Sequence, residues 1–315
     1  MTSPTPRERI IGGLVGLAVG DALGVPVEFT GRAMRDADPV VGMRGFGTWN
    51  QPAGTWSDDS SLAFASADRL GTHGWDPEAQ LSGFLAWLDQ SWWTPHGRVF
   101  DIGNATQTAL MRKRVGLPWN ECGGDEEHSN GNGGLMRLLP ASCWLFGRPT
   151  EEIIRLAGES SALTHAHPRS RLCAAFHALV SEDLLSGATV RVATMHAAAR
   201  LRRHVPSEER AALAALLDGS ALDQPHSGVR SDGYVVSTLE AALWCLEQHD
   251  DYSAAVLAAV NLGGDTDTTG AVAGGLAGLR GGLTAIPPEW INALARRDEV
   301  MALAGTFADA CLAGW

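Results

Sequence analysis

Apolar residues recur along most of the chain with the spacing of amphipathic helices. Leucine and phenylalanine occupy positions i, i+3, i+4 and i+7 between Leu81 and Leu88, and similar spacings appear in segments 239–246 and 300–307. Alternation typical of strands is confined to segments 190–192 and 234–236, which are too short to build a sheet. The pattern therefore predicts an all-α fold of packed helices.

Capping residues indicate where the predicted helices begin, and helix-breaking residues indicate the loops between them. Helix starts are expected where a cap precedes proline or acid in the first turn, at Asp76-Pro77, Thr150-Glu151-Glu152 and Ser207-Glu208-Glu209. Loops are expected where glycine, proline and charge concentrate, in segments 30–54, 116–132 and 219–233. No tandem repeat is visible, so one domain spanning residues 1–315 is the simplest organisation.

Glycine recurs at every fourth position in two segments near opposite ends of the chain. The stripes comprise Gly12, Gly16, Gly20 and Gly24, and then Gly270, Gly274, Gly278 and Gly282. Each glycine inside a helix costs about 1 kcal/mol relative to alanine, so the stripes predict that backbones come unusually close there. We expect the two helices to pack on each other or on immediate neighbours, which would place Glu28 near Asp265 and Asp267.

The apolar run at positions 10–19, preceded by Arg7 and Arg9, is similar to the hydrophobic region of a secretion signal. Asp21 and the glycine stripe argue against that interpretation. The run before this charge is also shorter than the roughly 20 apolar residues that span a bilayer. We expect a buried helix.

Composition narrows the possible partners and compartment. Lys plus Arg number 24 against 36 Asp plus Glu, and the net charge of −12 argues against a general surface for nucleic acids or anionic membranes. The 45% of hydrophobic residues is enough for a sizeable core. Five cysteines without C-x-x-C spacing predict neither a disulfide framework nor a zinc site, so a reducing cytoplasm is expected.

Two short acidic blocks, Trp-Ser-Asp-Asp-Ser at 56–60 and Gly-Gly-Asp-Thr-Asp-Thr at 263–268, set carboxylates beside hydroxyls. Brought together, they would form an oxygen-only cage that suits magnesium, manganese or calcium, whereas zinc and copper prefer His or Cys. The alternative is that Ser57 caps a helix whose dipole the following aspartates complement, and that Asp265 or Thr266 caps another helix.

The two blocks and four further stretches, in the same order along the chain, resemble the ADP-ribosylglycohydrolase family. The further stretches are Gly-Asp-Ala-Leu-Gly at 20–24 followed by Glu28, Asn-Gly-Asn-Gly-Gly-Leu-Met-Arg at 130–137, Leu-Thr-His at 163–165, and 233–236 leading into 238–244. The likeness covers nearly the whole chain. It implies a single compact orthogonal bundle of many helices with a central dinuclear metal site.

In this family two divalent cations lie at the centre of the bundle, and Mg²⁺ or Mn²⁺ is the implied pair. The matching ligand positions are Glu28, Ser57, Asp58, Asp59, Asp265, Asp267 and Thr268. Serine stands at positions 57 and 60 where threonine is common, but its hydroxyl can still bind a cation. The resemblance implies Asp59 as the base that takes a proton from water, with Glu28 as the alternative. Asp101 matches a segment that lines the cleft, or else it caps a helix.

The resemblance also implies a set of substrate contacts, with one phosphate-binding loop at its centre. That loop comprises Asn130, Gly131, Asn132, Gly133, Gly134, Leu135 and Met136. Its glycines could expose backbone N–H groups at the start of a helix, although alone the run would be a flexible turn. Serine or alanine often replaces Gly134, so a side-chain contact to phosphate is expected to be missing. His165 falls beside the substrate or is structural, Trp244 is expected in the core, and Tyr234 could stack on adenine or be core.

The expected activity is metal-dependent hydrolysis of ADP-ribosyl-arginine on protein, which would reverse a cognate ADP-ribosyltransferase. Serine-linked ADP-ribose, O-acetyl-ADP-ribose and nucleobase-linked ADP-ribose, including ADP-ribosylated nucleic acid, are alternative substrates, with segments 92–98 and 116–132 as the discriminating loops. Alternative functions are a non-catalytic ADP-ribose-binding protein and a structural protein on a former enzyme scaffold. The expected partners are an ADP-ribosylated protein or a small ADP-ribose conjugate, and no membrane.

Overall fold

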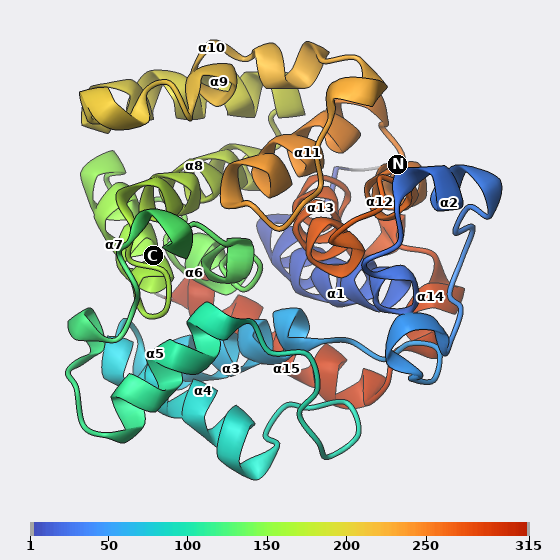
Figure 1. Ribbon diagram of the computed structural model, residues 1–315, viewed down its shortest axis with the longest axis horizontal. Coiled ribbons are helices and arrows are strands. Elements are labelled where there is room, and N and C mark those ends of the chain that lie inside the picture. The colour runs from blue at the N-terminus through green and yellow to red at the C-terminus, as the bar shows by residue number, and fades with distance from the viewer. Residues whose placement is uncertain (1–2, 314–315) are drawn as a thin grey trace.

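The computed structural model describes residues 3–313, which form fifteen α-helices joined by short 3-10 turns and loops, with no strand within that range (Figure 1). The α-helices are α1 (Pro6–Gly24), α2 (Arg32–Ala37), α3 (Asp58–His73), α4 (Pro77–Gln90), α5 (Asn104–Arg114), α6 (Leu139–Trp144), α7 (Thr150–Ala162), α8 (Pro168–Leu185), α9 (Val190–Leu201), α10 (Ala214–Asp218), α11 (Val235–Gln248), α12 (Tyr252–Asn261), α13 (Thr266–Gly281), α14 (Pro288–Ala293) and α15 (Arg297–Ala313). The all-α prediction is confirmed.

Helix α1 is the central element of the fold. It begins with a capping box, in which the Thr5 hydroxyl accepts the Glu8 N–H at 3.3 Å and the Glu8 carboxylate accepts the Thr5 N–H at 2.7 Å. Every residue from Arg9 to Gly24 is buried, which confirms the expected core helix. The longer segment 6–27, which includes Asp21, is long and apolar enough by length and composition to cross a membrane, but its apolar window is entirely buried inside the protein. Its position in the core accounts for its hydropathy.

Helices α1 and α13 lie side by side in the centre of the molecule (Figure 1) and meet without intervening side chains. A Cβ atom on Gly16 would lie 2.5 Å from the carbonyl oxygen of Gly274, and one on Gly270 would lie 2.5 Å from the carbonyl oxygen of Gly20. The paired positions run in opposite directions, so the helices are antiparallel. The predicted glycine contact is confirmed, and it brings the end of α1 to the start of α13.

The remaining helices surround this pair. Helices α3, α4 and α5 occupy the lower part of Figure 1, and α15 packs on both α1 and α3. Helix α11 packs along α13, and α8 joins that layer to α7 and α9. Segments 190–192 and 235–236, which looked strand-like, lie in the first turns of α9 and α11.

Only one of the three predicted helix starts has the expected capping residue. Asp76 caps α4 by accepting the N–H of Glu78 at 2.9 Å, as expected. Thr150 is not a cap, because it already lies inside α7 behind Pro149. The expected helix start at 207–209 was also wrong, since these residues form one 3-10 turn and the carboxylate of Glu209 is used in an ion pair with Arg169.

One predicted loop contains a helix that the sequence pattern did not indicate. Segment 30–54 includes α2, whose first residue, Arg32, donates to the carbonyl oxygens of Leu262 at 3.0 Å and His226 at 2.8 Å. These tertiary contacts hold a six-residue helix that has little apolar periodicity of its own. Segments 116–132 and 219–233 are irregular apart from short 3-10 turns.

Candidate active site

Acidic side chains converge where α1 ends and where α3 and α13 begin. The cluster comprises Asp21, Glu28, Asp58, Asp59, Asp265 and Asp267. Ser57 is the N-cap of α3 and accepts the N–H of Asp59 at 3.1 Å, so capping and membership of the cluster are compatible. The partial positive charges at the starts of α3 and α13 both face these carboxylates.

Two groups of carboxylate oxygens within the cluster could hold metal ions. Asp21, Asp59 and Asp267 form one group, and Glu28, Asp265 and Asp267 form the other, with ligand atoms within 4.8 Å of one another in each group. The Oδ2 atom of Asp59 is buried and accepts no hydrogen bond. A buried, unpartnered carboxylate oxygen is costly, so its presence here fits a hard cation as the missing partner.

Asp21 was not among the predicted site residues, although it lies in one of the recognised stretches. Its carboxylate accepts the N–H of Ser57 at 2.9 Å, the N–H of Ser60 at 3.0 Å and the Ser60 hydroxyl at 2.5 Å. These bonds hold the first turn of α3, and therefore Asp58 and Asp59, against the end of α1. The available signal was a single charge inside a run of apolar residues and glycines, which only a specific partner could stabilise.

Burial makes the cluster reluctant to ionise. It raises the pKa of Asp21 to about 7 and that of Glu28 to about 8, with the charge of Asp101 as the second cause at Glu28. The pKa values of Asp58, Asp59 and Asp267 are also raised well above the ordinary range, first by burial and then by neighbouring carboxylates. In the absence of a cation the cluster therefore retains protons, which a bound cation would displace.

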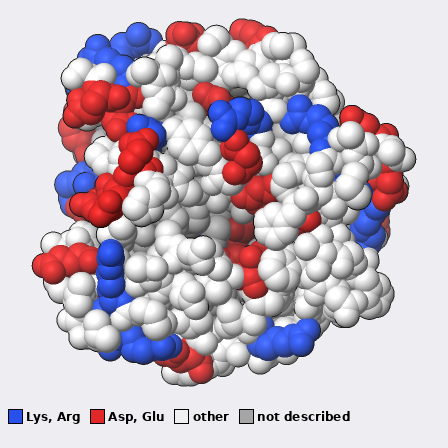
Figure 2. All heavy atoms as spheres, in the orientation of Figure 1, with Lys and Arg blue, Asp and Glu red and all other residues white. Residues whose placement is uncertain are grey.

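A cavity of about 270 Å³ opens above the cluster. Acidic side chains lie along one side of a hollow on the face shown in Figure 2. The cavity is lined by Glu28, Phe29, Asp58, Asp101, Gly103, Asn104, Ala105, Thr106, Gly131, Asn132, Gly133, Met136, His165, Asp265 and Thr268. The lining thus combines acidic side chains, the glycine loop beside them and the start of α5. A second cavity of about 430 Å³ shares Asn104 and Ala105, so the two together offer room for an extended ligand.

Asp101 lies on the acidic wall and does not cap a helix. Helix α5 begins at Asn104, and Gly103 rather than Asp101 occupies the N-cap position. Asp101 itself has a φ of 52°, a left-handed conformation that a side chain adopts rarely. Burial, followed by the charge of Asp265, raises the pKa of Asp101 to about 6.

The glycine loop is tied to the acidic wall through Asn132. The Asn132 side chain donates to Asp265 Oδ2 at 2.7 Å and to Thr238 Oγ1 at 2.9 Å, and its backbone N–H donates to the Gly233 carbonyl at 3.1 Å. Residues Asn132–Gly134 form a 3-10 turn rather than the expected start of an α-helix. A Cβ atom on Gly134 would lie 2.5 Å from the hydroxyl oxygen of Ser161, which explains why glycine replaces a larger residue here.

The buried guanidinium of Arg137 supports this loop from below. It donates to the carbonyl oxygens of Gly133 and, at 3.2 Å, Ser160, and it stacks on the ring of Phe84. Burial, followed by the charge of Arg137, lowers the pKa of His165 to about 3, so the imidazole is neutral near pH 7. His165 can therefore contact a ligand at the cavity wall only as a neutral group.

The predicted substrate residues divide into two sets. Gly131, Asn132, Gly133, Met136 and His165 line the cavity, whereas Asn130, Gly134, Leu135 and Tyr234 lie outside that lining. Leu135 is buried in the hydrophobic core. Tyr234 accepts a hydrogen bond from Arg169 at 3.1 Å, and Trp244 is buried with its indole N–H donating to the Gln224 carbonyl at 2.9 Å, as expected for a core residue.

Aromatic side chains lie at the acidic mouth of the cavity. The sequence patterns did not predict this arrangement. Phe29 is 67% exposed and follows Glu28 directly, and the indole N–H of Trp49 donates to the Glu28 carboxylate. The ring centroids of Phe29 and Trp49 are 6.2 Å apart, and those of Trp49 and Phe100 are 5.8 Å apart. The available signal was the direct adjacency of an aromatic residue to an acid at 28–29 and again at 100–101.

The fold and the buried carboxylates beside a glycine loop are those of an all-helical hydrolase. The family model for ADP-ribosylglycohydrolase matches residues 2–314, and the chain belongs to this family. It is 33% identical over 306 residues to an ADP-ribosylarginine hydrolase Tri1 of Pseudomonas putida (strain GB-1), covering 96% of this chain and 79% of that protein. It is 30% identical over 322 residues to the ADP-ribosyl-[dinitrogen reductase] glycohydrolase of Rhodospirillum rubrum, covering 97% and 99% of the two chains.

The similarity extends to three-dimensional structure. A solved ADP-ribosylglycohydrolase-related protein complex superposes with a TM-score of 0.83 at 33% sequence identity, and the match covers 98% of this chain and 99% of that one. The resemblance inferred from the sequence motifs is therefore confirmed at the level of the family and of the fold.

Proposed function

We propose that this protein is a metal-dependent hydrolase that removes ADP-ribose from arginine side chains of modified proteins, in reversal of an ADP-ribosyltransferase. The observation that carries the proposal is the pair of carboxylate groups sharing Asp267, two of whose members, Glu28 and Asp265, line one cavity together with a glycine loop. Similarity to two proteins named ADP-ribosylarginine hydrolase, at 33% and 32% identity, supports the choice of arginine as acceptor.

The residues that would hold Mg²⁺ or Mn²⁺ are Glu28, Asp59, Asp265 and Asp267, assisted by the oxygens of Ser57, Asp58 and Thr268. Asp21, whose oxygens accept hydrogen bonds from Ser57 and Ser60, would orient these ligands. A pair of such cations, when bound, orients the vicinal hydroxyls of a ribose and lowers the pKa of a bound water. The acidic wall would then hold the distal ribose, and the glycine loop would hold the diphosphate through backbone N–H groups.

The chain's own carboxylates would act on the bond between ribose and acceptor. Cleavage of a glycosidic bond develops positive charge on the sugar, which nearby carboxylates such as Asp101 stabilise. The family resemblance puts Asp59 before Glu28 as the base, but the position of the two carboxylates relative to the cavity reverses that order. Glu28 lines the cavity whereas Asp59 lies 1% exposed beneath it, which favours Glu28 as the group that takes a proton from water.

The mouth of the cavity supports a cationic acceptor. A guanidinium stacks favourably on aromatic rings and pairs with carboxylates, and Phe29 and Trp49 stand beside Glu28 and Asp101. Serine-linked ADP-ribose would leave these groups without a cation to bind. Loss of the Phe29 ring should therefore weaken release from arginine more than release from serine.

A release assay followed by mass spectrometry tests both parts of the proposal. Arginine-, serine- and nucleobase-linked ADP-ribose and O-acetyl-ADP-ribose are offered in parallel with Mg²⁺, with Mn²⁺ and with EDTA, to the wild type, Asp59→Asn and Phe29→Ala. We expect metal-dependent release that is fastest from arginine, is lost in Asp59→Asn and is less selective in Phe29→Ala. Binding of ADP-ribose without release from any conjugate would instead identify a non-catalytic ADP-ribose-binding protein.

A further inference from the structure

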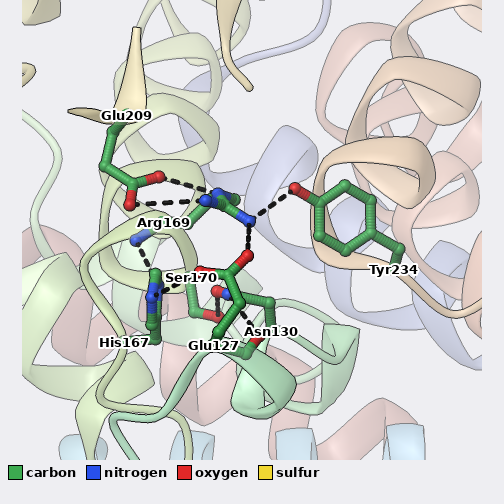
Figure 3. Close-up of polar contacts among 7 residues, drawn as sticks. All are labelled: Glu127, Asn130, His167, Arg169, Ser170, Glu209 and Tyr234. Atoms are coloured by element: carbon green, nitrogen blue, oxygen red, sulfur yellow. Dashed lines mark hydrogen bonds and ion pairs between the residues drawn. The ribbon is translucent and has the colours of Figure 1, made fainter. Parts of the chain in front are cut away.

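A charged cluster outside the carboxylate centre joins the start of α8 to three other segments of the chain (Figure 3). Its centre is Arg169, in the first turn of α8, whose guanidinium donates to Glu209 at 2.7 Å, to Glu127 at 2.7 Å and to the Tyr234 hydroxyl at 3.1 Å. The Arg169 side chain is only 13% exposed. One arginine thus ties together residues that lie more than a hundred positions apart.

His167 strengthens the same cluster in a defined tautomer. Its Nδ1 atom accepts the backbone N–H of Arg169 at 3.1 Å, so this nitrogen carries no proton. The proton of the neutral ring is therefore on Nε2, which lies 3.3 Å from a carboxylate oxygen of Glu127. Glu127 is consequently held by two donors from the start of α8, although its own side chain is 74% exposed.

The cluster is connected directly to the glycine loop. The Glu127 carbonyl accepts the Asn130 side-chain amide at 2.9 Å, and Asn130 Oδ1 accepts the hydroxyl of Ser170 at 3.2 Å. The Asn130 carbonyl accepts the N–H of Val235 at 3.0 Å, next to Tyr234. The residues immediately beside Arg169 and Tyr234 therefore fix the first residue of the loop, one position before Gly131 in the cavity wall.

The two acidic partners of Arg169 contribute differently. The Glu209 side chain is 6% exposed, so losing the arginine would leave a buried carboxylate without a partner, which is strongly destabilising. Glu127 is solvent-exposed, and an exposed ion pair contributes little stability by itself. Glu209 is thus the anchor that fixes the guanidinium, and Glu127 is the part of the loop that the guanidinium holds.

We propose that Arg169 is a positioning residue that holds segment 127–134 in the conformation that receives the substrate. The inference rests on the proposed function only in taking this loop as a contact for a nucleotide diphosphate. Ordering the loop before binding removes an entropic cost from association, so Arg169 acts on substrate affinity. The cluster includes none of the metal-binding carboxylates and reaches them indirectly, through Asn132, which donates to Asp265. Its effect on metal affinity and on the chemical step should therefore be smaller than its effect on substrate affinity.

The test compares Arg169→Gln with Arg169→Lys and with Arg171→Gln, a matched control at an exposed position on the same helix. Kd for ADP-ribose, KM and kcat for the arginine-linked conjugate, and the Mg²⁺-induced rise in Tm are measured for each. We expect Arg169→Gln to raise Kd and KM about tenfold, the equivalent of ordering one or two side chains, with smaller changes in kcat and in the Mg²⁺ response. Arg169→Lys keeps the charge but not the planar guanidinium, so its Kd and KM should lie between those of the wild type and those of Arg169→Gln.

Amide hydrogen exchange of segment 127–134 in the ligand-free protein gives a readout that needs no substrate. Exchange should become faster in Arg169→Gln and stay unchanged in Arg171→Gln. If Arg169→Gln is poorly folded, the double variant Arg169→Gln/Glu209→Gln removes the unpaired buried charge and is used instead. Unchanged exchange together with unchanged Kd, or a fall in kcat at constant KM, would overturn the inference. Faster exchange in a protein that releases no ADP-ribose would overturn the proposed function and leave the positioning role standing.

Discussion

The contact between α1 and α13 and the carboxylate centre at its end are built in opposite ways from the same two helices. Along the contact, side chains are absent and backbone meets backbone at Gly16 and Gly274. At the end of the contact, the turn after α1 and the first turn of α13 bring the carboxylates of Glu28 and Asp267 together. The first region is a close packing of uncharged backbone, whereas the second gathers carboxylates whose charges repel one another.

This difference assigns a distinct role to each region. Backbone contact leaves no freedom for the helices to slide or separate, because any shift would create either overlap or a void. The carboxylates are therefore held close despite their repulsion, and their raised pKa values record the cost of that arrangement. The glycine contact is a rigid support, and the carboxylate centre is completed only by a bound cation.

The largest expected effect comes from placing a side chain in the glycine contact. A Cβ atom at Gly270 would lie 2.5 Å from the Gly20 carbonyl oxygen, and backbone cannot relax as a side chain does. We expect Gly270→Ala to lower the free energy of unfolding by more than the about 3 kcal/mol typical of overpacking, with loss of soluble protein. The control is Gly71→Ala in α3, where the nearest atoms would be 3.9 Å away and the better helix propensity should stabilise by about 1 kcal/mol. Equal Tm values for the two variants would show that the contact is not rigid.

The second prediction separates activity from stability at the carboxylate centre. Asp267→Asn removes the one carboxylate that both groups share, so we expect activity to fall about a thousandfold or more, a loss of about 4 kcal/mol. The ligand-free variant should unfold at the same temperature as the wild type or higher, because the cost of burying an ionisable carboxylate among other carboxylates is gone. Asp298→Asn, whose side chain is 91% exposed, serves as the control for both measurements. A variant that loses stability and activity together would make Asp267 a structural residue.

The glycine contact could also be predicted from the sequence more completely than the carboxylate centre. The glycine stripes predicted the contact because helical periodicity and the absence of side chains are both visible in residue order. Glu28 and the acidic blocks were placed by that contact and by resemblance, since no local pattern brings positions 28, 58 and 265 together. Asp21 was recognised but not assigned, because its hydrogen bonds to Ser57 and Ser60 exist only after α1 packs on α3.

The cavity walls were harder to predict than the acidic cluster. Leu135 and Met136 are neighbours in one stretch and both belong to the core, yet only Met136 also lines the cavity. The 3-10 turn before them is held by buried Arg137, which donates to the Gly133 carbonyl. The aromatic mouth combines Trp49 and Phe100 from separate irregular segments, whose positions follow from tertiary contacts rather than periodicity. The placement of side chains on irregular backbone could therefore not be predicted from this sequence.

The third prediction concerns Asp21, which lies where the two regions meet. Asn at this position keeps the size of the side chain, but it loses the charge that accepts three donors from the first turn of α3. We expect Asp21→Asn to weaken Mg²⁺ or Mn²⁺ binding about 10- to 100-fold, as loss of residues that orient metal ligands does, and to reduce activity less than Asp267→Asn. Calorimetric titration of the cation measures the affinity. An affinity equal to that of the wild type would show that the start of α3 holds its place without Asp21.

The smallest expected effect is a dependence of stability on pH that reverses when a cation is bound. Asp21, with a pKa of about 7, and Glu28, with a pKa of about 8, bind protons in the ligand-free folded state that they release on unfolding, where carboxyl pKa values are about 4. The folded state therefore holds more protons between about pH 4 and 8, so the Tm of the cation-free protein should fall by a few degrees as pH rises through that window.

A bound cation requires the ionised carboxylates, so its stabilising effect should grow over the same range of pH. Differential scanning calorimetry in Mg²⁺ and in EDTA, at about pH 6 and about pH 8, measures both trends. The rise in Tm caused by Mg²⁺ should be larger at the higher pH, and Asp267→Asn should abolish this increase while retaining the glycine contact. A rise that is independent of pH in the wild type would mean that these carboxylates are already ionised without a cation, and the contrast between a self-sufficient contact and a centre completed by its ligand would then be wrong.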